Sequence, residues 1–137
     1  NQIKYKNFVG CSNTIVKGKA IKKILNKINQ NLVAFDWCIA KLLLLNKFKG
    51  YYMSRPLTFY RQYSENTSSL TKITKIKIKK DIQCKLEHFR YFEKFGIDYK
   101  SQIQELKKKK KKIENKKFFI DIKKRFQNKN QYWWSTV

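Results

Sequence analysis

Acidic residues are scarce in this chain of 137 residues, which has 9 Asp plus Glu against 33 Lys plus Arg. The formal net charge of +24 makes a compact fold repel itself, because a large excess of one charge destabilises the folded state. A polyanion relieves this repulsion, since lysines that neutralise phosphates release the counterions condensed on a nucleic acid. The shortage of acids therefore favours a polyanionic partner.

Histidine and cysteine are also few. The chain has one histidine, His88, and three widely spaced cysteines, Cys11, Cys38 and Cys84, with no Cys-x-x-Cys pair. A disulfide framework needs paired cysteines, and a zinc site needs clustered Cys and His ligands. Cys84 and His88 lie four residues apart and offer at most a two-ligand half-site, so ordinary packing is favoured. We expect no metal, no cofactor and a compartment that does not form disulfides.

Catalytic motifs and long apolar runs are missing as well. The chain has no Gly-rich phosphate loop, no His-Glu pair with metal spacing and no Gly-x-Ser-x-Gly. We therefore expect no enzyme and no small-molecule substrate. The most apolar stretch, 31–46, contains Asp36 and Lys41 and is shorter than the ~20 apolar residues of a spanning helix. We expect no membrane span and no membrane partner.

The abundant residues point to the coding genome. Lysine outnumbers arginine 29 to 4, alanine occurs three times, and Asn, Ile, Phe and Tyr are frequent. These are the amino acids of A/T-rich codons, which favours an organelle or a protist with biased DNA. Residues 1–35 are basic and contain no acid. Such a stretch is typical of an organelle-targeting segment or of a basic arm that touches RNA.

Apolar residues recur at three- and four-residue steps, which predicts an all-α fold with short helices and one long one. The expected helices cover 19–46, with a possible break near 29–31, then 72–94, 99–110 and 116–126. Within 72–94, Ile76 and Ile78 alternate with lysines as in a strand, but the helical steps extend over four turns. The lysine run 107–112 is then either a solvated face or a contact surface.

Turn and cap residues separate these helices. Gly50 is placed to end the first one, and Pro56 makes 50–57 a turn. The polar stretch 64–71 is either a loop or exposed helix. Gly96 has the position of a C-terminal cap, whereas Asp98 and Asn115 precede helices as N-caps do.

The segment NKFKGYYMSRPLTFYRQ, residues 46–62, combines basic and aromatic side chains with no acid. The planar forks of Arg55 and Arg61 fit phosphate bidentately. Tyrosines such as Tyr51 either stack on unpaired bases or sugars, or pack against a helix. Gly50 lacks a Cβ and lets the backbone approach a ligand closely.

This segment resembles the Lys-Gly-Tyr-Tyr turn, with a following Arg and Tyr-Arg, of the bacterial-type large-subunit ribosomal protein L-twenty family. A second block, FGIDYKSQIQELKKKKKKIENKKFFIDI, is similar to the C-terminal signature of that family, with Asp98 in place of serine. The resemblance covers about 41–122. The matching residues are Leu44, Leu45, Lys49, Gly50, Tyr51, Tyr52, Arg55, Tyr60 and Arg61 in the first block, and Gly96, Ile97, Tyr99, Ile103, Leu106, Lys107, Lys108, Asn115 and Lys117 in the second.

The resemblance implies an all-helical protein that binds large-subunit rRNA early in assembly, next to other ribosomal proteins. It also implies a basic N-terminal extension (1–40), an rRNA-threading region with a long helix (41–95), a small C-terminal helical domain (96–126) and a tail (127–137). Together with the A/T-rich composition it favours a mitochondrial ribosome, with a plastid-type ribosome second. The tail carries Trp133 and Trp134, which we expect to pack onto a neighbouring protein.

We predict that RNA is contacted by the basic and aromatic residues of both blocks and of the helix between them. These residues are Lys47, Lys49, Gly50, Tyr51, Tyr52, Arg55, Tyr60, Arg61, Lys75, Lys77, Lys79, Lys80, Arg90, Lys107, Lys108 and Lys117. The alternative function is a basic accessory subunit of an organellar membrane complex that docks on acidic protein or lipid surfaces. It is motivated by the aromatic tail and the amphipathic segment 19–46. A third hypothesis is that the chain is a DNA-compacting nucleoid protein.

Overall fold

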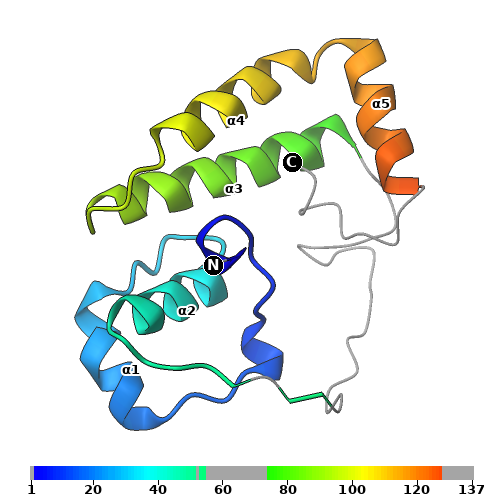
Figure 1. The fold of residues 1–137 in the computed structure, drawn as a ribbon. Helices are drawn as coiled ribbons and strands as arrows, with labels where there is room; N and C mark the ends of the chain where they lie inside the picture. The colour runs from blue at the N-terminus through cyan, green and yellow to red at the C-terminus, as the bar shows by residue number, and fades with distance from the viewer. Residues whose placement is uncertain (1, 52, 55–73, 128–137) are drawn as a thin grey trace. The chain divides into compact units, whose positions relative to one another are not determined.

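The computed structural model describes residues 2–51, 53–54 and 74–127, and every regular element in these ranges is helical. The prediction of an all-α fold is therefore confirmed. The chain divides into two compact units, Asn1–Arg61 and Gln62–Val137 (Figure 1). Residues 1–40 thus share a unit with those that follow them. The predicted division at 40, 95 and 126 stays a prediction.

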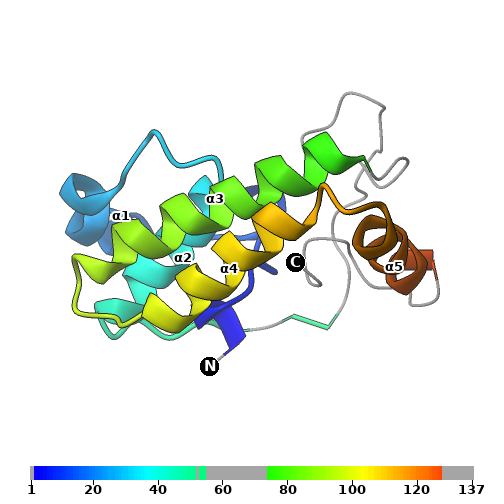
Figure 2. The same cartoon turned by 90° about the horizontal axis from the view of Figure 1, so that it is seen from above.

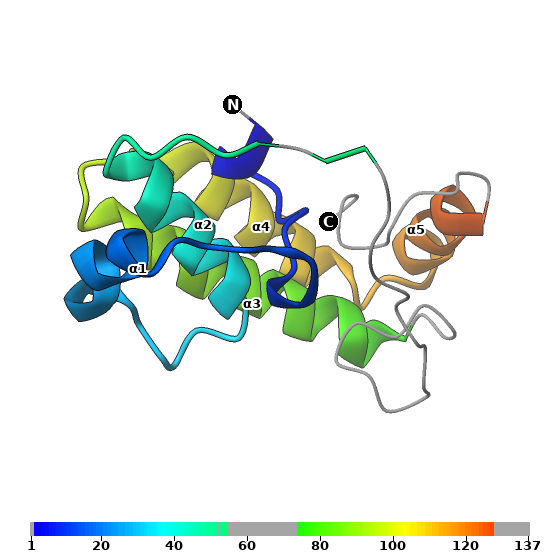
Figure 3. The ribbon, with the colours of Figure 1, turned by 90° about the horizontal axis from the view of Figure 1, so that it is seen from below.

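The first unit is built around two short α-helices. α1 packs on α2, and the first 3-10 turn, η1, also packs on α2 (Figure 3). In chain order its elements are η1 (Gln2–Lys4), η2 (Cys11–Asn13), α1 (Gly18–Ile24), η3 (Leu25–Lys27) and α2 (Phe35–Leu45). Its buried apolar side chains are Ala20, Ile24, Leu32, Trp37, Cys38 and Leu42.

Long-range hydrogen bonds attach the N-terminal segment to α2. The indole Nε1 of Trp37 donates to the backbone carbonyl of Ile3 at 2.6 Å. The amide Nδ2 of Asn7 donates to Oδ1 of Asp36 at 2.9 Å. Because buried polar groups need such partners, these bonds fix residues 3–7 along the helix.

The segment predicted as helix over 19–46, with a possible break near 29–31, forms two separate α-helices. α1 ends at Ile24, and α2 begins at Phe35 after a 3-10 turn and a loop. In that loop the side chain Oδ1 of Asn29 accepts a hydrogen bond from the backbone N–H of Asn31 at 3.0 Å. Asn side chains compete in this way with helical hydrogen bonds, so the break near 29–31 is real and wider than expected.

α2 also ends earlier than Gly50. Lys47 adopts a left-handed φ of 64°. Its backbone N–H donates to the carbonyl of Leu44 at 3.0 Å, and the N–H of Phe48 donates to the carbonyl of Leu43 at 3.1 Å. These two bonds form a Schellman motif, which usually has glycine at the left-handed position. Here a lysine occupies it, and Gly50 lies beyond the helix.

The second unit contains the helices α3 (Lys75–Glu93), α4 (Lys100–Lys112) and α5 (Lys116–Gln127). α3 and α4 run antiparallel and side by side, and α5 turns away from α4 (Figures 1 and 2). The helices predicted for 72–94, 99–110 and 116–126 are therefore confirmed in the described ranges, and the lysine run 107–112 is helical.

The core of the second unit lies along the helical face that the sequence predicts. α3 contributes Ile78, Ile82, Leu86, Phe89 and Phe92, and the following chain contributes Tyr99, Ile103, Leu106 and Ile113. The rings of Phe89 and Tyr99 stack with centroids 4.5 Å apart and an interplanar angle of 12°. Ile76, by contrast, is 67% exposed, so the strand-like alternation carries no structural meaning.

The predicted caps hold the ends of these helices. Gly96 has a φ of 77° and donates its N–H to the carbonyl of Glu93 at 3.0 Å. Oδ1 of Asn115 accepts from the N–H of Phe118 at 3.2 Å, as an N-cap does. Oδ1 of Asp98 accepts from the N–H of Lys100 at 2.9 Å, although Asp98 precedes the N-cap position by one residue.

Candidate nucleic-acid interface

A lysine-lined groove lies where α3 and α4 run side by side. Its volume is about 490 Å³, and its lining residues are Lys79, Lys107, Lys110, Lys111 and Glu114. Four of the five side chains are cationic and one is anionic. The groove can thus hold an anion between two helix walls.

Helix geometry explains why these side chains meet. Residues 110, 111 and 114 lie three, four and seven positions after Lys107, which places all four on one face of α4 and its C-terminal turn. The antiparallel pairing brings the start of α3 beside the end of α4, so Lys79 lies opposite them. The lysine run is also placed favourably, because cations stabilise the C-terminal end of a helix dipole.

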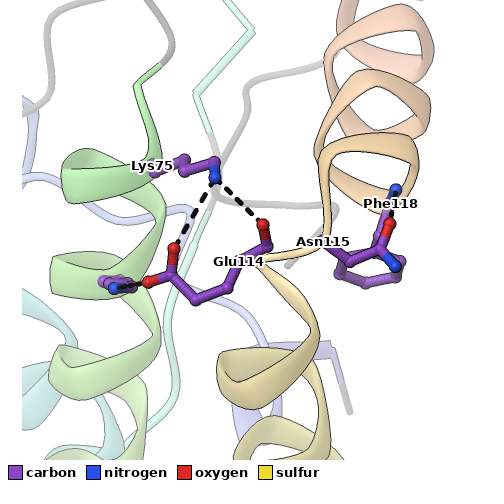
Figure 4. Close-up of polar contacts among 5 residues, drawn as sticks. Lys75, Glu114, Asn115 and Phe118 are labelled. Carbon is purple, nitrogen blue, oxygen red and sulfur yellow. Dashed lines mark hydrogen bonds and ion pairs between the residues drawn. The ribbon is translucent and has the colours of Figure 1, made fainter.

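Glu114 is the acid at the centre of this arrangement. Lys75 Nζ donates to the main-chain oxygen of Glu114 at 3.1 Å and lies 3.6 Å from its Oε2 (Figure 4). Lys79 Nζ pairs with Oε1 of the same carboxylate. The hydrogen bond and charge of Lys79, followed by those of Lys75, hold the pKa of Glu114 below its usual value.

The other wall of the groove is formed by lysines of α4. Lys110 Nζ donates to Oε1 of Gln83 at 2.8 Å, and Nε2 of Gln83 donates to Glu87 at 2.8 Å. Within the described part of the chain, Lys107 and Lys111 form no ion pair. Both side chains are exposed and line the groove.

The groove brings together two of the predicted contact residues of this unit, Lys79 and Lys107, and Lys75 pairs with the lining residue Glu114. The others do not line it. Lys80, Arg90, Lys108 and Lys117 are exposed elsewhere, and Lys77 is half-buried.

The predicted turn in the first unit is described in part. Lys47, Lys49, Gly50 and Tyr51 are exposed, and Tyr51 is 90% exposed. Tyr51 is thus open to a ligand, and the alternative of packing against a helix is wrong for it. Tyr52, Arg55, Tyr60 and Arg61 lie outside the described residues, so their predicted roles stay predictions.

The predicted contact residues did not include Glu114, nor Lys110 and Lys111, which were considered only as part of the lysine run 107–112. Their spacing of three, four and seven from Lys107 was a usable signal, because these steps define one helix face. What the spacing does not reveal is which face of a six-lysine run meets another helix. The pairing of α3 with α4 decides it.

The described ranges hold neither a cluster of metal ligands nor a membrane-spanning helix. No group of three His, Cys, Asp or Glu side chains there is arranged to hold a metal ion. His88 is buried, with its ring 4.7 Å from the ring of Phe92. None of the described helices combines the length and the apolar character needed to cross a membrane.

Comparison with known proteins identifies no relative of this chain. No family model, curated protein or solved structure matches the chain. What the chain does is therefore inferred from the groove, the charge and the two sequence blocks.

Outside the groove, Lys41 and Asp81 have strongly shifted pKa values. Lys41 is 3% exposed; its Nζ donates to the carbonyl of Lys4 at 3.4 Å and lies 5.1 Å from the Trp37 ring centroid. Burial lowers the pKa of Lys41 to about 7. Burial raises the pKa of Asp81 to about 6, against the opposing effect of Lys85 at 3.8 Å.

These two shifts predict a minimum in stability between pH 6 and 7. From pH 3.8 to about 6 the folded chain keeps a proton on Asp81 that the unfolded chain has lost, so the unfolding free energy falls as pH rises. From about 7 to 10.5 the unfolded chain keeps a proton on Lys41 that the folded chain has lost, so the free energy rises.

Urea denaturation across this pH range measures the effect. Lys41→Met should remove the rise above pH 7 and leave the fall below pH 6, whereas Asp81→Asn should do the reverse. A Lys41→Met curve parallel to wild type above pH 7 would show that Lys41 titrates normally in the fold.

Proposed function

We propose that this chain is a structural constituent of the large ribosomal subunit and binds large-subunit rRNA. The groove between α3 and α4 is the observation that carries the proposal, because lysines from two helices converge there around one acid. The net charge of +24 supports a polyanionic partner, since phosphate binding offsets the self-repulsion of the chain.

The proposed mechanism is positional and needs no catalysis. The groove lysines neutralise backbone phosphates, which gives affinity without reading sequence. Tyr51, open to solvent, supplies a ring on which an unpaired base stacks. Bound in this way, the chain supports subunit assembly beside neighbouring ribosomal proteins. The A/T-rich composition favours a mitochondrial ribosome as its location.

Salt dependence tests the RNA-binding part of the proposal. The logarithm of the binding constant for large-subunit rRNA should fall linearly with the logarithm of salt concentration. Because each phosphate contact on single-stranded nucleic acid contributes a slope of about −0.7, the four groove lysines alone predict about −3. Titration at several salt concentrations, with duplex DNA of equal length as the control, measures this. A slope shallower than about −1 would argue against phosphate binding.

Sedimentation tests the ribosomal part. In a detergent-washed organelle extract, the chain should travel with the large ribosomal subunit, and RNase rather than DNase should release it. Migration with a membrane complex would favour the accessory-subunit alternative. Release by DNase would favour a nucleoid protein.

A further inference from the structure

The carboxylate of Glu114 lines the groove and is held there by two lysines of α3. It receives Lys75 and Lys79 from α3, while Lys107 and Lys111 lie on the opposite wall. A carboxylate presents two anionic oxygens to these ammonium groups, as a phosphodiester does. Glu114 thus has the chemistry of an internal substitute for a phosphate.

We propose that one phosphate of an RNA backbone binds between Lys75 and Lys79 and displaces the carboxylate of Glu114. This site rests on the proposed rRNA-binding function and specifies where the phosphate sits. Glu114 then acts as a placeholder: it keeps the two lysines together before RNA arrives and lowers the affinity for weak anions.

The surroundings of Glu114 allow its side chain to leave. The side chain is 63% exposed, so its withdrawal opens no cavity. The preceding residue, Ile113, is fully buried and anchors the backbone. The next residue, Asn115, caps α5 through Phe118 (Figure 4). The main chain therefore stays in place while the carboxylate rotates away.

The lining of the groove also indicates the class of ligand. It consists of lysines and one glutamate, with no aromatic ring among its lining residues. Lysine ammonium groups act as point charges, and the bound group is therefore a backbone phosphate of any sequence. After displacement of Glu114, the remaining lysines leave positive charge for a neighbouring phosphate.

A matched pair of variants tests the displacement. Glu114→Gln and Glu105→Gln each remove one negative charge from the same unit, and the two side chains are equally exposed, at 63% and 64%. Glu105 pairs with Lys109 at 2.9 Å and does not line the groove. Any difference between the variants therefore reports the groove and not net charge.

The probe is a short single-stranded oligouridylate, with affinity measured by fluorescence anisotropy at several salt concentrations. Glu114→Gln should bind about fivefold more tightly than wild type at 0.1 M salt, because the phosphate no longer has to break the exposed ion pairs of Glu114. The salt slope should stay the same, because both proteins make the same number of phosphate contacts once RNA is bound. Glu105→Gln should stay within about twofold of wild type. Equal tightening in both variants, or weaker binding by Glu114→Gln, would overturn the proposal.

A second measurement uses the wild-type chain and does not depend on either variant folding. Carboxyl NMR signals of Glu114 should shift when oligouridylate is added, whereas those of Glu105 should stay in place. An unshifted Glu114 at saturation would also overturn the proposal. If these tests succeed but the chain fails to travel with the large subunit, the ribosomal function fails and the phosphate site stands.

Discussion

Replacing Lys107, Lys110 and Lys111 together by glutamine should weaken binding to large-subunit rRNA about a hundredfold at 0.1 M salt. Each lost phosphate contact on a single strand removes a factor of about five at this concentration, and the salt slope should flatten by about two. All three side chains line one groove, so their contacts are lost together. Filter binding or anisotropy against salt concentration measures both quantities.

The triple glutamine variant should keep the stability of the fold. Glutamine has nearly the helix propensity of lysine, and the change removes like-charge pairs at three- and four-residue spacing. The change also removes cations from the C-terminal end of α4 and the hydrogen bond from Lys110 to Gln83, so these effects offset one another. The unfolding free energy should therefore change by no more than about 0.5 kcal/mol while the affinity falls. A large loss of affinity with nearly unchanged stability separates a lost binding surface from a damaged protein.

The matched control is the triple glutamine variant at Lys17, Lys19 and Lys22, which are exposed on or next to α1. It removes the same charge from the other unit and should cost less than about tenfold in affinity. Equal losses in the two triple variants would show that RNA responds to total charge alone. The groove would then have no special role.

The sequence predicted the second unit well because its signals are local. Ile78, Ile82 and Leu86 repeat at helical steps, and all three are buried on α3. Gly96 and Asn115 end or begin helices through bonds to near neighbours. Such signals act within about one helical turn, so a single sequence reveals them.

The first unit was less predictable because its organisation depends on distant or competing bonds. The bond from Trp37 to Ile3 spans 34 residues and has no local signature. Leu25 fits the apolar pattern of one continuous helix, yet it is 62% exposed. The Asn29 side chain interrupts the helix instead. The end of α2 at Leu45 was predicted to within one residue, but Lys47 and not Gly50 takes the left-handed conformation that follows it.

Only some residues of the groove were predicted, because the groove also depends on how distant segments pack. Lys75 and Lys79 were candidates from their charge, and Lys107 also from the second sequence block, without any indication that the three lie together. Choosing Lys110 and Lys111 over their neighbours requires the register of α4 against α3. Glu114 attracts no notice in a search for cations, and only the pairing of the helices shows that it separates Lys75 and Lys79 from an external anion.

Replacing Tyr99 by alanine should lower the unfolding free energy of the chain by about 3 to 5 kcal/mol, as for other large buried aromatic side chains. Tyr99 is fully buried and stacks on Phe89 at the turn that joins α3 to α4. The cost includes the buried apolar area, the cavity that remains and the ring stacking. Urea denaturation followed by circular dichroism at 222 nm measures it.

Lys100→Ala provides the control one residue away, because Lys100 is exposed and should change stability by less than about 0.5 kcal/mol. Tyr99→Ala should also weaken RNA binding, since the two groove walls depend on the packing of α4 against α3. Added rRNA should recover part of the lost stability, because a ligand of the folded state shifts unfolding by mass action. A loss below about 1 kcal/mol would mean that the Tyr99–Phe89 stack does not hold the helices, and that the groove is maintained by other contacts.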